Sequence, residues 1–306
     1  MIDNNFIFTN FTNNESHNSL DSKLRENLQI YIISELASSN FYNDFAFTGG
    51  TCLRLMHGLN RYSEDLDFDA IDKKQKEYNF NNYFEPILDL IEGFGIEVEL
   101  FEKKKNMQTS IKTFYFNFNY WNLLDVFNLS HYKENFQESQ KLKIKFELQT
   151  DLYNGETFET IESDFPLYRT NTVDRTSMFA NKLNAILYRN EAGQVKGRDF
   201  FDLKYYIENE VELNLPLFLD CLSKNGMTLN GKQIYPTLPK NKEELISLIK
   251  TKIKKINFGD VVDDIFPFVE KNFDFSKYNI KDFLKLVEKI NVNFPTQEQD
   301  NFMDND

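Results

Sequence analysis

The sequence predicts an α/β (α+β) protein with a mixed β-sheet flanked by helices in its first half and a helical domain in its second. Short apolar strands and amphipathic helices interleave over the first half. Residues 141–149 alternate apolar and polar side chains, as a half-buried strand does. After about residue 160 the pattern becomes helical. We therefore expect domains at 1–165 and 166–295, followed by an acidic tail, 296–306, that we expect to be disordered.

The elements of the first half follow from apolar spacing and from signals at the ends of helices and strands. Leucines recur at helical spacing from Ser19 to Ser38, and Ser19 or Asp21 is suited to cap this helix. Gly58 is well placed to end a short helix that starts near Thr51. The other elements expected in this half are strands at 45–47, 66–70, 96–101, 111–118 and 141–149 and a helix at 83–94.

The second half is predicted to contain five helices. Each is indicated by apolar residues three and four positions apart, and the helix near 239–256 also carries several lysines. The predicted helices cover residues 178–189, 199–209, 215–224, 239–256 and 283–290.

Composition limits the classes of protein that are possible. The chain has 306 residues, a net charge of −13, two cysteines and three histidines. Cysteines so few and far apart make neither a disulfide framework nor a zinc site. No run of about twenty apolar residues indicates a membrane span, and the N-terminus lacks the pattern of a secretory signal. We expect a cytoplasmic protein that does not bind to membranes and does not coat nucleic acid broadly.

The most informative segment joins two glycines to two aspartates. Gly49 and Gly50 follow an apolar strand, and Asp65 and Asp67 lie one residue apart on the next strand, so both carboxylates share a face. Mg²⁺ prefers such hard oxygen ligands together with substrate phosphates, and glycines let the backbone approach a phosphate closely. Taken singly, these features are typical of a turn and of surface acids. Together they predict a site for a nucleoside triphosphate (NTP).

A third carboxylate is expected beside the first pair, because two-metal phosphoryl transfer commonly uses three acids. Glu147, on the polar side of the strand at 141–149, is the preferred candidate, and Asp151 is its rival. The structural alternative is that Glu147 forms an ion pair with Lys143 or Lys145.

The helical half carries its own polar cluster. Lys182 and Arg189 are seven residues apart and share a helix face, as do Asp199 and Asp202 three residues apart. The basic side chains suit binding of triphosphate oxygens, and a nearby aspartate suits either orienting the lysine or holding and deprotonating an acceptor hydroxyl. The alternative is a salt-bridge network between two helices. The lysines at 250–255 are predicted to form a solvated helix face, or else contacts to RNA phosphates.

These residues together resemble the AbiEii-type nucleotidyltransferase toxins, within the DNA polymerase β-like nucleotidyltransferase superfamily. The matching pieces, in order, are Gly49-Gly50-Thr51 with Leu53 and Arg54; Arg61-x-Ser63-x-Asp65-Leu66-Asp67-Phe68; Lys182 with Ala185 and Arg189; and Arg198-Asp199-x-x-Asp202-Leu203. The superfamily's usual Gly-Ser is Gly-Gly-Thr here, and Thr51 supplies a hydroxyl in place of the serine.

The resemblance implies a nucleotidyltransferase core with a C-terminal helical domain. It implies transfer of a nucleoside monophosphate from an NTP with Mg²⁺, release of pyrophosphate, a role as a toxin or in phage defence, a separately encoded antitoxin, and tRNA as one acceptor. Asp65 and Asp67 are then expected to bind metal and Lys182 to contact the nucleotide. Asp199 or Asp202 is the acid of the fourth motif.

For the triphosphate itself, we expect contacts from Gly49, Gly50 and Thr51. Further nucleotide contacts are expected from Arg54, Arg61 and Arg189, and Ser63 is expected to brace the turn before the acidic strand. Two alternatives remain open: transfer to a small molecule or a protein, and a catalytically inactive module that binds nucleotides and interacts with a partner.

Overall fold

The computed structural model describes residues 11–12, 14–72, 78–103, 110–151, 154–164, 167–189 and 195–295. The chain divides into two compact units. The first contains Met1–Leu152, Phe158–Val173 and Phe268–Glu270, and the second contains Tyr153–Thr157, Asp174–Pro267 and Lys271–Asp306. The tail expected at 296–306 lies outside the described residues. No helix in the described ranges is both long and apolar enough to cross a membrane.

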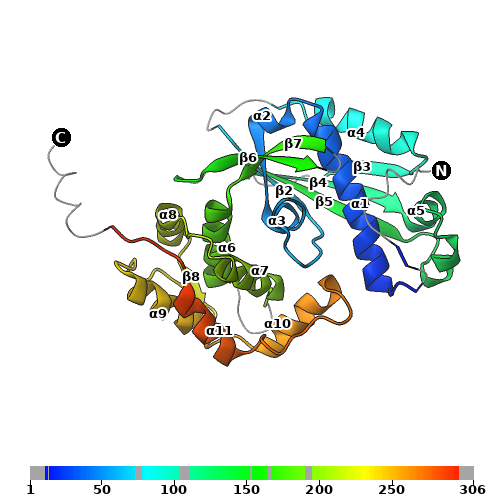
Figure 1. The fold of residues 1–306 in the computed structure, drawn as a ribbon. Coiled ribbons are helices and arrows are strands. Elements are labelled where there is room, and N and C mark those ends of the chain that lie inside the picture. The colour runs from blue at the N-terminus through cyan, green and yellow to red at the C-terminus, as the bar shows by residue number, and fades with distance from the viewer. Residues whose placement is uncertain are drawn as a thin grey trace. The chain divides into compact units, whose positions relative to one another are not determined.

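The first unit is built on a mixed seven-stranded sheet, which confirms the predicted fold class (Figure 1). The strand order is β3-β4-β5-β2-β1-β7-β6. Strand β2 pairs with β5, and β1 with β7, in parallel, and the other neighbours are antiparallel. The strands are β1 (Phe45–Thr48), β2 (Leu66–Ala70), β3 (Val98–Glu102), β4 (Ile111–Asn119), β5 (Lys141–Gln149), β6 (Phe158–Asp164) and β7 (Leu167–Val173).

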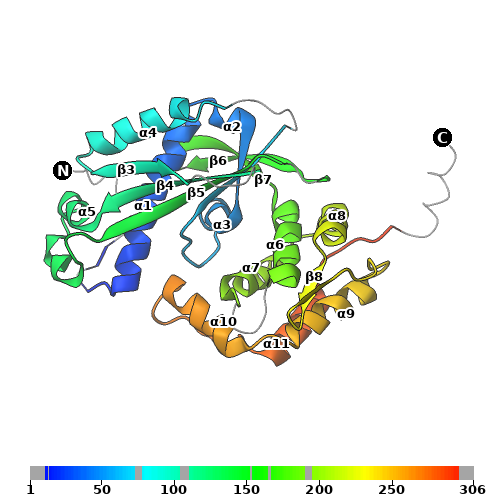
Figure 2. The same ribbon diagram turned by 180° about the vertical axis from the view of Figure 1, so that it is seen from behind.

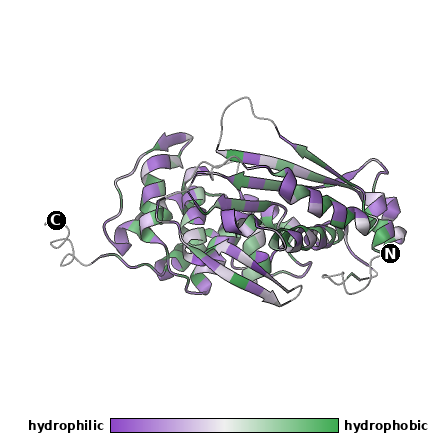
Figure 3. Cartoon of the chain, turned by 90° about the horizontal axis from the view of Figure 1, so that it is seen from above, coloured by the Kyte–Doolittle hydropathy of each residue, from purple (hydrophilic) through white to green (hydrophobic). Residues whose placement is uncertain are grey.

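One face of this sheet carries a core of aromatic rings. Hydrophobic and hydrophilic residues alternate along the strands (Figure 3), so every second side chain points to this face. The Phe68 ring lies 5.1 Å from that of Phe47 and 4.7 Å from that of Phe146, between centroids. Phe84 of helix α4 (Asn81–Gly93) completes this core with an edge-to-face contact to Phe146. The polar side chains of β2 and β5 therefore lie on the opposite face.

The remaining helices of the first unit surround the sheet. Helix α3 (Gly49–His57) contacts β1 and β2 (Figures 1 and 2). Helix α1 (His17–Ala37) contacts α4, β5 and β7. The short helices α2 (Phe41–Asp44) and α5 (Tyr120–Val126) precede β1 and follow β4, and a 3₁₀ helix, η2, covers Ser130–Asn135.

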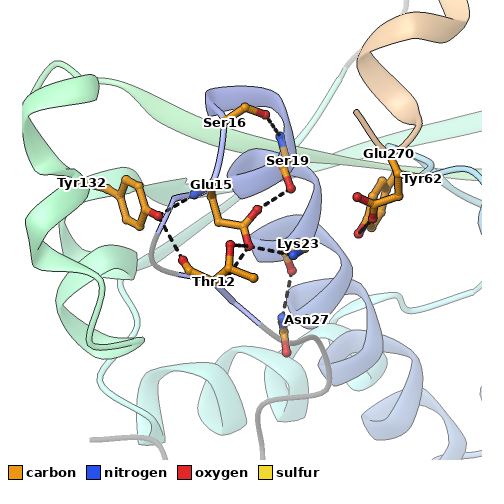
Figure 4. Close-up of polar contacts among 9 residues, drawn as sticks. All are labelled: Thr12, Glu15, Ser16, Ser19, Lys23, Asn27, Tyr62, Tyr132 and Glu270. Carbon is orange, nitrogen blue, oxygen red and sulfur yellow. Dashed lines mark hydrogen bonds and ion pairs between the residues drawn. The ribbon is translucent and has the colours of Figure 1, made fainter. Parts of the chain in front are cut away.

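Helix α1 begins earlier than expected. Ser16, and not Ser19 or Asp21, caps it, because the Ser16 hydroxyl accepts a hydrogen bond from the Ser19 amide. Glu15 extends this cap, since its carboxylate accepts hydrogen bonds from Thr12, Ser19 and Lys23 (Figure 4). The predicted cap residues, Ser19 and Asp21, both lie within the helix, whereas the true cap, Ser16, precedes the first apolar residue of the repeat.

Strands β6 and β7 were not predicted from the sequence. They form an antiparallel hairpin, and β7 joins the sheet next to β1. Strand β6 is rich in acidic residues and lies at the edge of the sheet. An edge strand needs little apolar alternation, which is why the pattern gave no signal there.

The second unit is mainly helical. Its helices are α6 (Arg175–Arg189), α7 (Gly197–Glu208), α8 (Leu215–Asn225), α9 (Lys242–Ile253), α10 (Phe258–Ile265) and α11 (Ile280–Leu286), with 3₁₀ turns η3 (Phe266–Phe268) at its border and η4 (Val287–Lys289). A small hairpin, β8 (Met227–Leu229) and β9 (Lys232–Ile234), was not predicted. Gly197 permits a close approach of α7 to α10, because a Cβ there would lie 2.0 Å from the Val261 carbonyl oxygen.

Candidate active site

The turn between β1 and α3 is shaped around the side chain of Asp67. Gly49 has a φ of +78°, a backbone conformation that favours glycine. A Cβ on Gly49 would lie 2.4 Å from Asp67 Oδ2. Only glycine therefore leaves room for the carboxylate to lie against the start of α3. The structure brings the predicted glycine turn and the predicted acidic strand into direct contact.

Gly50 adjoins the other part of the predicted motif. A Cβ on Gly50 would lie 2.7 Å from an Arg61 guanidinium nitrogen and 2.8 Å from Ser63 Oγ. Arg61 is only 3% exposed, so its guanidinium is held close to the turn and does not extend into solvent. Gly49 thus lies next to a carboxylate, and Gly50 lies next to a cation and a hydroxyl.

Asp67 also lies next to the third predicted acid. Register pairs Asp67 with Thr48 of β1 on one side and with Glu147 of β5 on the other. Paired residues on neighbouring strands project to the same face of a sheet. Asp67 and Glu147 therefore share the polar face, and Asp65, two residues before Asp67, continues that row. Asp151, the rival of Glu147, is an exposed residue beyond the end of β5.

Two neighbours of Glu147 were not predicted as site residues, although Lys145 was considered as its ion-pair partner. Thr113 of β4 donates a hydrogen bond to Glu147 Oε1 at 3.1 Å, and Lys145 forms an ion pair with Glu147 Oε2. Burial alone lowers the pKa of Lys145, but Glu147, Asp65 and Asp67 together outweigh burial and raise it. The ammonium of Lys145 therefore interacts electrostatically with all three predicted metal ligands.

The predicted acidic ligands are not arranged around one metal position in this structure. Within the described ranges, no group of three or more histidine, cysteine, aspartate or glutamate side chains is arranged to hold a metal ion. The Lys145 ammonium takes up the Glu147 carboxylate instead. Carboxylates on one face are nevertheless the hard donors that Mg²⁺ prefers, so the set of residues fits this ion in chemical type.

The structure gives Thr51 a bracing role. Its side chain is 1% exposed, and its hydroxyl donates a hydrogen bond to the main-chain carbonyl of Asp65. This bond ties the first turn of α3 to the residue before β2. The hydroxyl was expected at the phosphates, and here it fixes the position of a metal-ligand candidate.

Arg54 belongs to a different group of contacts. It lies in the last turn of α3, its Nε is 2.7 Å from Glu26 Oε1, and its guanidinium stacks 4.6 Å from the centre of the Tyr62 ring. The helix spacing alone did not reveal these partners, because Glu26 comes from α1. Arg54 thus stabilises the neighbourhood of Tyr62 in this structure.

The predicted cluster of the second unit forms a compact ion network. Lys182 Nζ lies 3.0 Å from Asp199 Oδ1 and 2.9 Å from Asp202 Oδ2. Arg189 binds Asp199 through two nitrogens, at 3.0 and 3.1 Å. Asp199 and Asp202 are almost fully buried. The structure therefore contains the inter-helix salt-bridge network that was the alternative reading, and Lys182 is held at its centre.

The lysines at 250–255 do not form a uniform solvated face. Lys252 is fully buried and donates to the Thr228 carbonyl, and Lys250 pairs with Glu288 at 2.5 Å. Helix periodicity could not show this, because the hairpin that receives Lys252 was not predicted.

A second group of lysines surrounds a cavity of about 280 Å³ in the second unit, which we call the lysine hollow. Its residues are Lys204, Lys277, Lys285 and Lys289, two acids, Glu208 and Asp282, and the apolar side chains Phe283 and Leu286.

Both acids of the lysine hollow already interact with neighbouring side chains. Glu208 pairs with Lys204, and Asp282 accepts a hydrogen bond from Asn279 at 2.6 Å. Among the described residues, Lys277, Lys285 and Lys289 have no ion-pair partner within 4.0 Å. The hollow is therefore locally positive in a chain whose net charge is −13.

Comparisons with known proteins identify the family and the fold of the chain. The model of a family described as "Nucleotidyl transferase AbiEii toxin, Type IV TA system" matches residues 31–288. No curated protein matches the chain.

Two solved structures from Helicobacter pylori resemble the fold. JHP933 is 18% identical, with a TM-score of 0.52, over 90% of this chain and 92% of that chain. A candidate nucleotidyltransferase is also 18% identical, with a TM-score of 0.51, over 90% and 95% of the two chains. At this identity the likeness concerns the fold alone.

Proposed function

Because the chain belongs to the AbiEii family of nucleotidyltransferase toxins of type IV toxin–antitoxin systems, we propose that it transfers a nucleoside monophosphate from an NTP to a hydroxyl acceptor and releases pyrophosphate. The contact between Asp67 and Gly49 is the observation that carries the proposal. It joins a metal-binding type of side chain to a turn whose backbone suits phosphate.

The residues of the first unit have distinct roles in this proposal. The backbone N–H groups at the start of α3 bind the terminal phosphates, helped by the positive end of the helix dipole. Arg61 adds a positive charge beside Gly50, and Ser63 supplies a hydroxyl. The acceptor oxygen forms a bond to the α-phosphorus as the bond to pyrophosphate breaks. Arg61 and the helix end stabilise the charge that develops on the departing pyrophosphate.

Mg²⁺ is the metal that fits the carboxylates, and Asp65 and Asp67 are the residues that would hold it. Bound there, it would supply activation of the acceptor hydroxyl and neutralisation of phosphate charge. Glu147 would add a third carboxylate if its ion pair with Lys145 were broken. Without a metal, Lys145 offsets part of the negative charge of the three acids.

In the second unit, Lys182 is the proposed nucleotide contact. Asp199 and Asp202 hold its ammonium in place and are positioning residues. Arg189 fixes Asp199 in turn.

We further propose that the acceptor is an RNA, of which tRNA is the first to test. The lysine hollow favours this reading, because three lysines without described ion-pair partners suit phosphate groups. Transfer to a small molecule or a protein remains the alternative outcome of the same experiment. As in other members of toxin–antitoxin systems, a separately encoded antitoxin is the expected protein partner.

The experiment incubates purified protein with each labelled NTP and Mg²⁺, with total tRNA or without an acceptor. Asp67→Asn is expected to lower transfer by about three orders of magnitude, because it removes charge where the metal and phosphates meet. Asp69→Asn is the matched control, since Asp69 lies on the same face of β2, two residues further along. Near-normal transfer by Asp67→Asn would overturn the assignment.

The location of the label decides the acceptor. Label on tRNA supports the RNA proposal, and label on protein or a small molecule redirects it. Binding of NTP with no turnover under any of these conditions would support the inactive module.

A further inference from the structure

We propose that Tyr62 and Glu270 are positioning residues that hold the loop carrying Arg61 and Ser63 against the glycine turn. The inference rests on the proposed role of that turn in binding the triphosphate. It adds two residues, one of them distant in the sequence, to the machinery of the reaction. We call the contact of residues 268–270 with Tyr62 the strap.

The strap consists of two hydrogen bonds to one residue. The Tyr62 main-chain N–H donates to the Phe268 carbonyl at 2.8 Å, and the Tyr62 hydroxyl donates to Glu270 Oε1 at 3.2 Å. Figure 4 shows the Tyr62 ring beside Glu270. Residues 268–270 belong to the first unit, although the chain before and after them belongs to the second. Backbone and side chain of Tyr62 are thus both fixed by one short segment.

Tyr62 transmits this restraint directly to its neighbours. Arg61 Nη1 donates to the Tyr62 carbonyl at 2.9 Å, and the same guanidinium lies against Gly50. On the other side of the loop, Gln29 Nε2 donates to the Ser63 carbonyl at 3.1 Å. A movement of Tyr62 would therefore displace Arg61 from the turn, while α1 holds the Ser63 end.

The ring of Tyr62 is restrained as well. It is only 8% exposed and lies under the guanidinium of Arg54, which is itself bound to Glu26. Burial first, and then the charges of Glu270 and Glu26, raise the pKa of Tyr62. The hydroxyl therefore stays protonated at neutral pH and remains a donor to Glu270. Arg54, which was expected to contact the nucleotide, packs here on the ring of Tyr62.

The structural part of the proposal is tested by hydrogen exchange, which requires no activity. Tyr62→Phe and Glu270→Ala are expected to speed amide exchange in residues 61–65, because each removes the hydrogen bond between the Tyr62 hydroxyl and the Glu270 carboxylate. Glu270→Gln keeps an acceptor for the Tyr62 hydroxyl and is expected to restore most of the protection. Unchanged exchange in both Tyr62→Phe and Glu270→Ala would overturn the strap, whether or not the chain transfers nucleotides.

The functional part is tested by kinetics with the labelled NTP. Tyr62→Phe and Glu270→Ala are expected to raise KM for the NTP on the order of tenfold with a smaller change in kcat, because a misplaced Arg61 weakens triphosphate binding. The double variant is expected to be no worse than either single one, since both break the same bond.

Tyr132→Phe is the matched control. The Tyr132 hydroxyl, in the same unit, accepts a hydrogen bond from the Glu15 amide and donates one to the Thr12 carbonyl (Figure 4). Its loss is expected to lower the thermal midpoint while leaving KM within twofold of wild type. An equal rise of KM in Tyr132→Phe and Tyr62→Phe would show a general loss of stability and overturn the positioning role. Absence of transfer and of NTP binding in the wild type would instead refute the proposed function.

Discussion

Asp67 and Glu147 lie directly opposite each other on the parallel strands β2 and β5. Their positions follow from two independent segments of the sequence, each of which alternates apolar and polar residues. Because the aromatic side chains of both strands fill the core, the two acids share the polar face. This relationship supports the proposal that Glu147 is the third metal ligand, which can be tested apart from catalysis.

Glu147→Gln is expected to reduce the stabilisation of the protein by Mg²⁺ and to lower turnover by about two orders of magnitude, because it removes one anionic ligand. The shift of the thermal midpoint is measured against Mg²⁺ concentration in the presence of a nonhydrolysable NTP. Glu99→Gln is the control, since Glu99 also pairs with a lysine of β5, Lys141, at 2.6 Å. Equal Mg²⁺ responses of wild type and Glu147→Gln would remove Glu147 from the site.

Gly49→Ala is expected to abolish transfer, because its Cβ would displace the Asp67 carboxylate. The positive φ alone costs an alanine about 1–2 kcal/mol of stability. Gly58→Ala separates the two effects, since Gly58 has a φ of +71° but no heavy atom within 4 Å of an added Cβ. Both variants are compared by chemical unfolding and by NTP transfer. Loss of activity in both to the same extent would mean that the contact with Asp67 is unimportant.

Asp202→Asn is expected to lower the free energy of unfolding by about 3 kcal/mol, because it leaves Lys182 without one partner in a buried network. Lys182→Met/Asp202→Asn is expected to be less destabilised than the sum of the single variants. A cycle on the more exposed pair Lys224–Asp220 is the control and is expected to show coupling below about 1 kcal/mol. Strict additivity for Lys182 and Asp202 would contradict the network.

The lysine hollow is expected to bind RNA phosphates. Lys277→Gln/Lys285→Gln/Lys289→Gln is expected to weaken tRNA binding and to reduce the slope of log affinity against log salt by about two. Lys232→Gln/Lys240→Gln/Lys242→Gln removes the same charge from another part of the unit. Fluorescence anisotropy at several salt concentrations measures both. If the two triple variants behave alike, the hollow has no special role.

The cap of α1 is expected to respond to acid. Burial raises the pKa of Glu15, but hydrogen bonds from Lys23, Ser19 and Thr12 outweigh burial and lower it from 4.5 to about 2. A lowered pKa means that the unfolded chain takes up the proton first, so this contribution to stability is present above pH 4.5. It is lost as pH falls toward 2.

The corresponding variant is Glu15→Gln. It is expected to be less stable than wild type by about 1–2 kcal/mol at pH 7, with a difference that shrinks below pH 4.5. Chemical unfolding across this pH range measures the difference. A difference that grows toward low pH would contradict the assigned direction of the pKa shift.

Strong period-two and helical patterns predicted much of the fold. The strands at 66–70 and 141–149 have the predicted bounds, and Gly58 ends α3 in the left-handed conformation. The hairpin β8–β9 was missed although Asn230 and Gly231 carry the dipeptide typical of its turn, both with positive φ. Its strands are three residues long, too short for a periodic signal.

The site residues were predicted by type, and their contacts were not. Alternation placed Asp65, Asp67 and Glu147 on a face, because that depends only on the pleat of a strand. The partners of Thr51 and Arg54 depend on how separate elements pack, which local spacing does not contain. The role of Glu270 could not be predicted for the same reason, since it contacts Tyr62 only in the folded chain.

The strap has a consequence for how this enzyme can be divided. A fragment that stops at Val173 would include Gly49, Gly50, Asp65, Asp67 and Glu147 and yet lack residues 268–270. Such a fragment would lose the proposed restraint on Arg61 as well as Lys182 of the second unit. Three residues of the C-terminal half thus belong to the unit that holds the glycine turn, and a truncation that removes them is expected to weaken NTP binding.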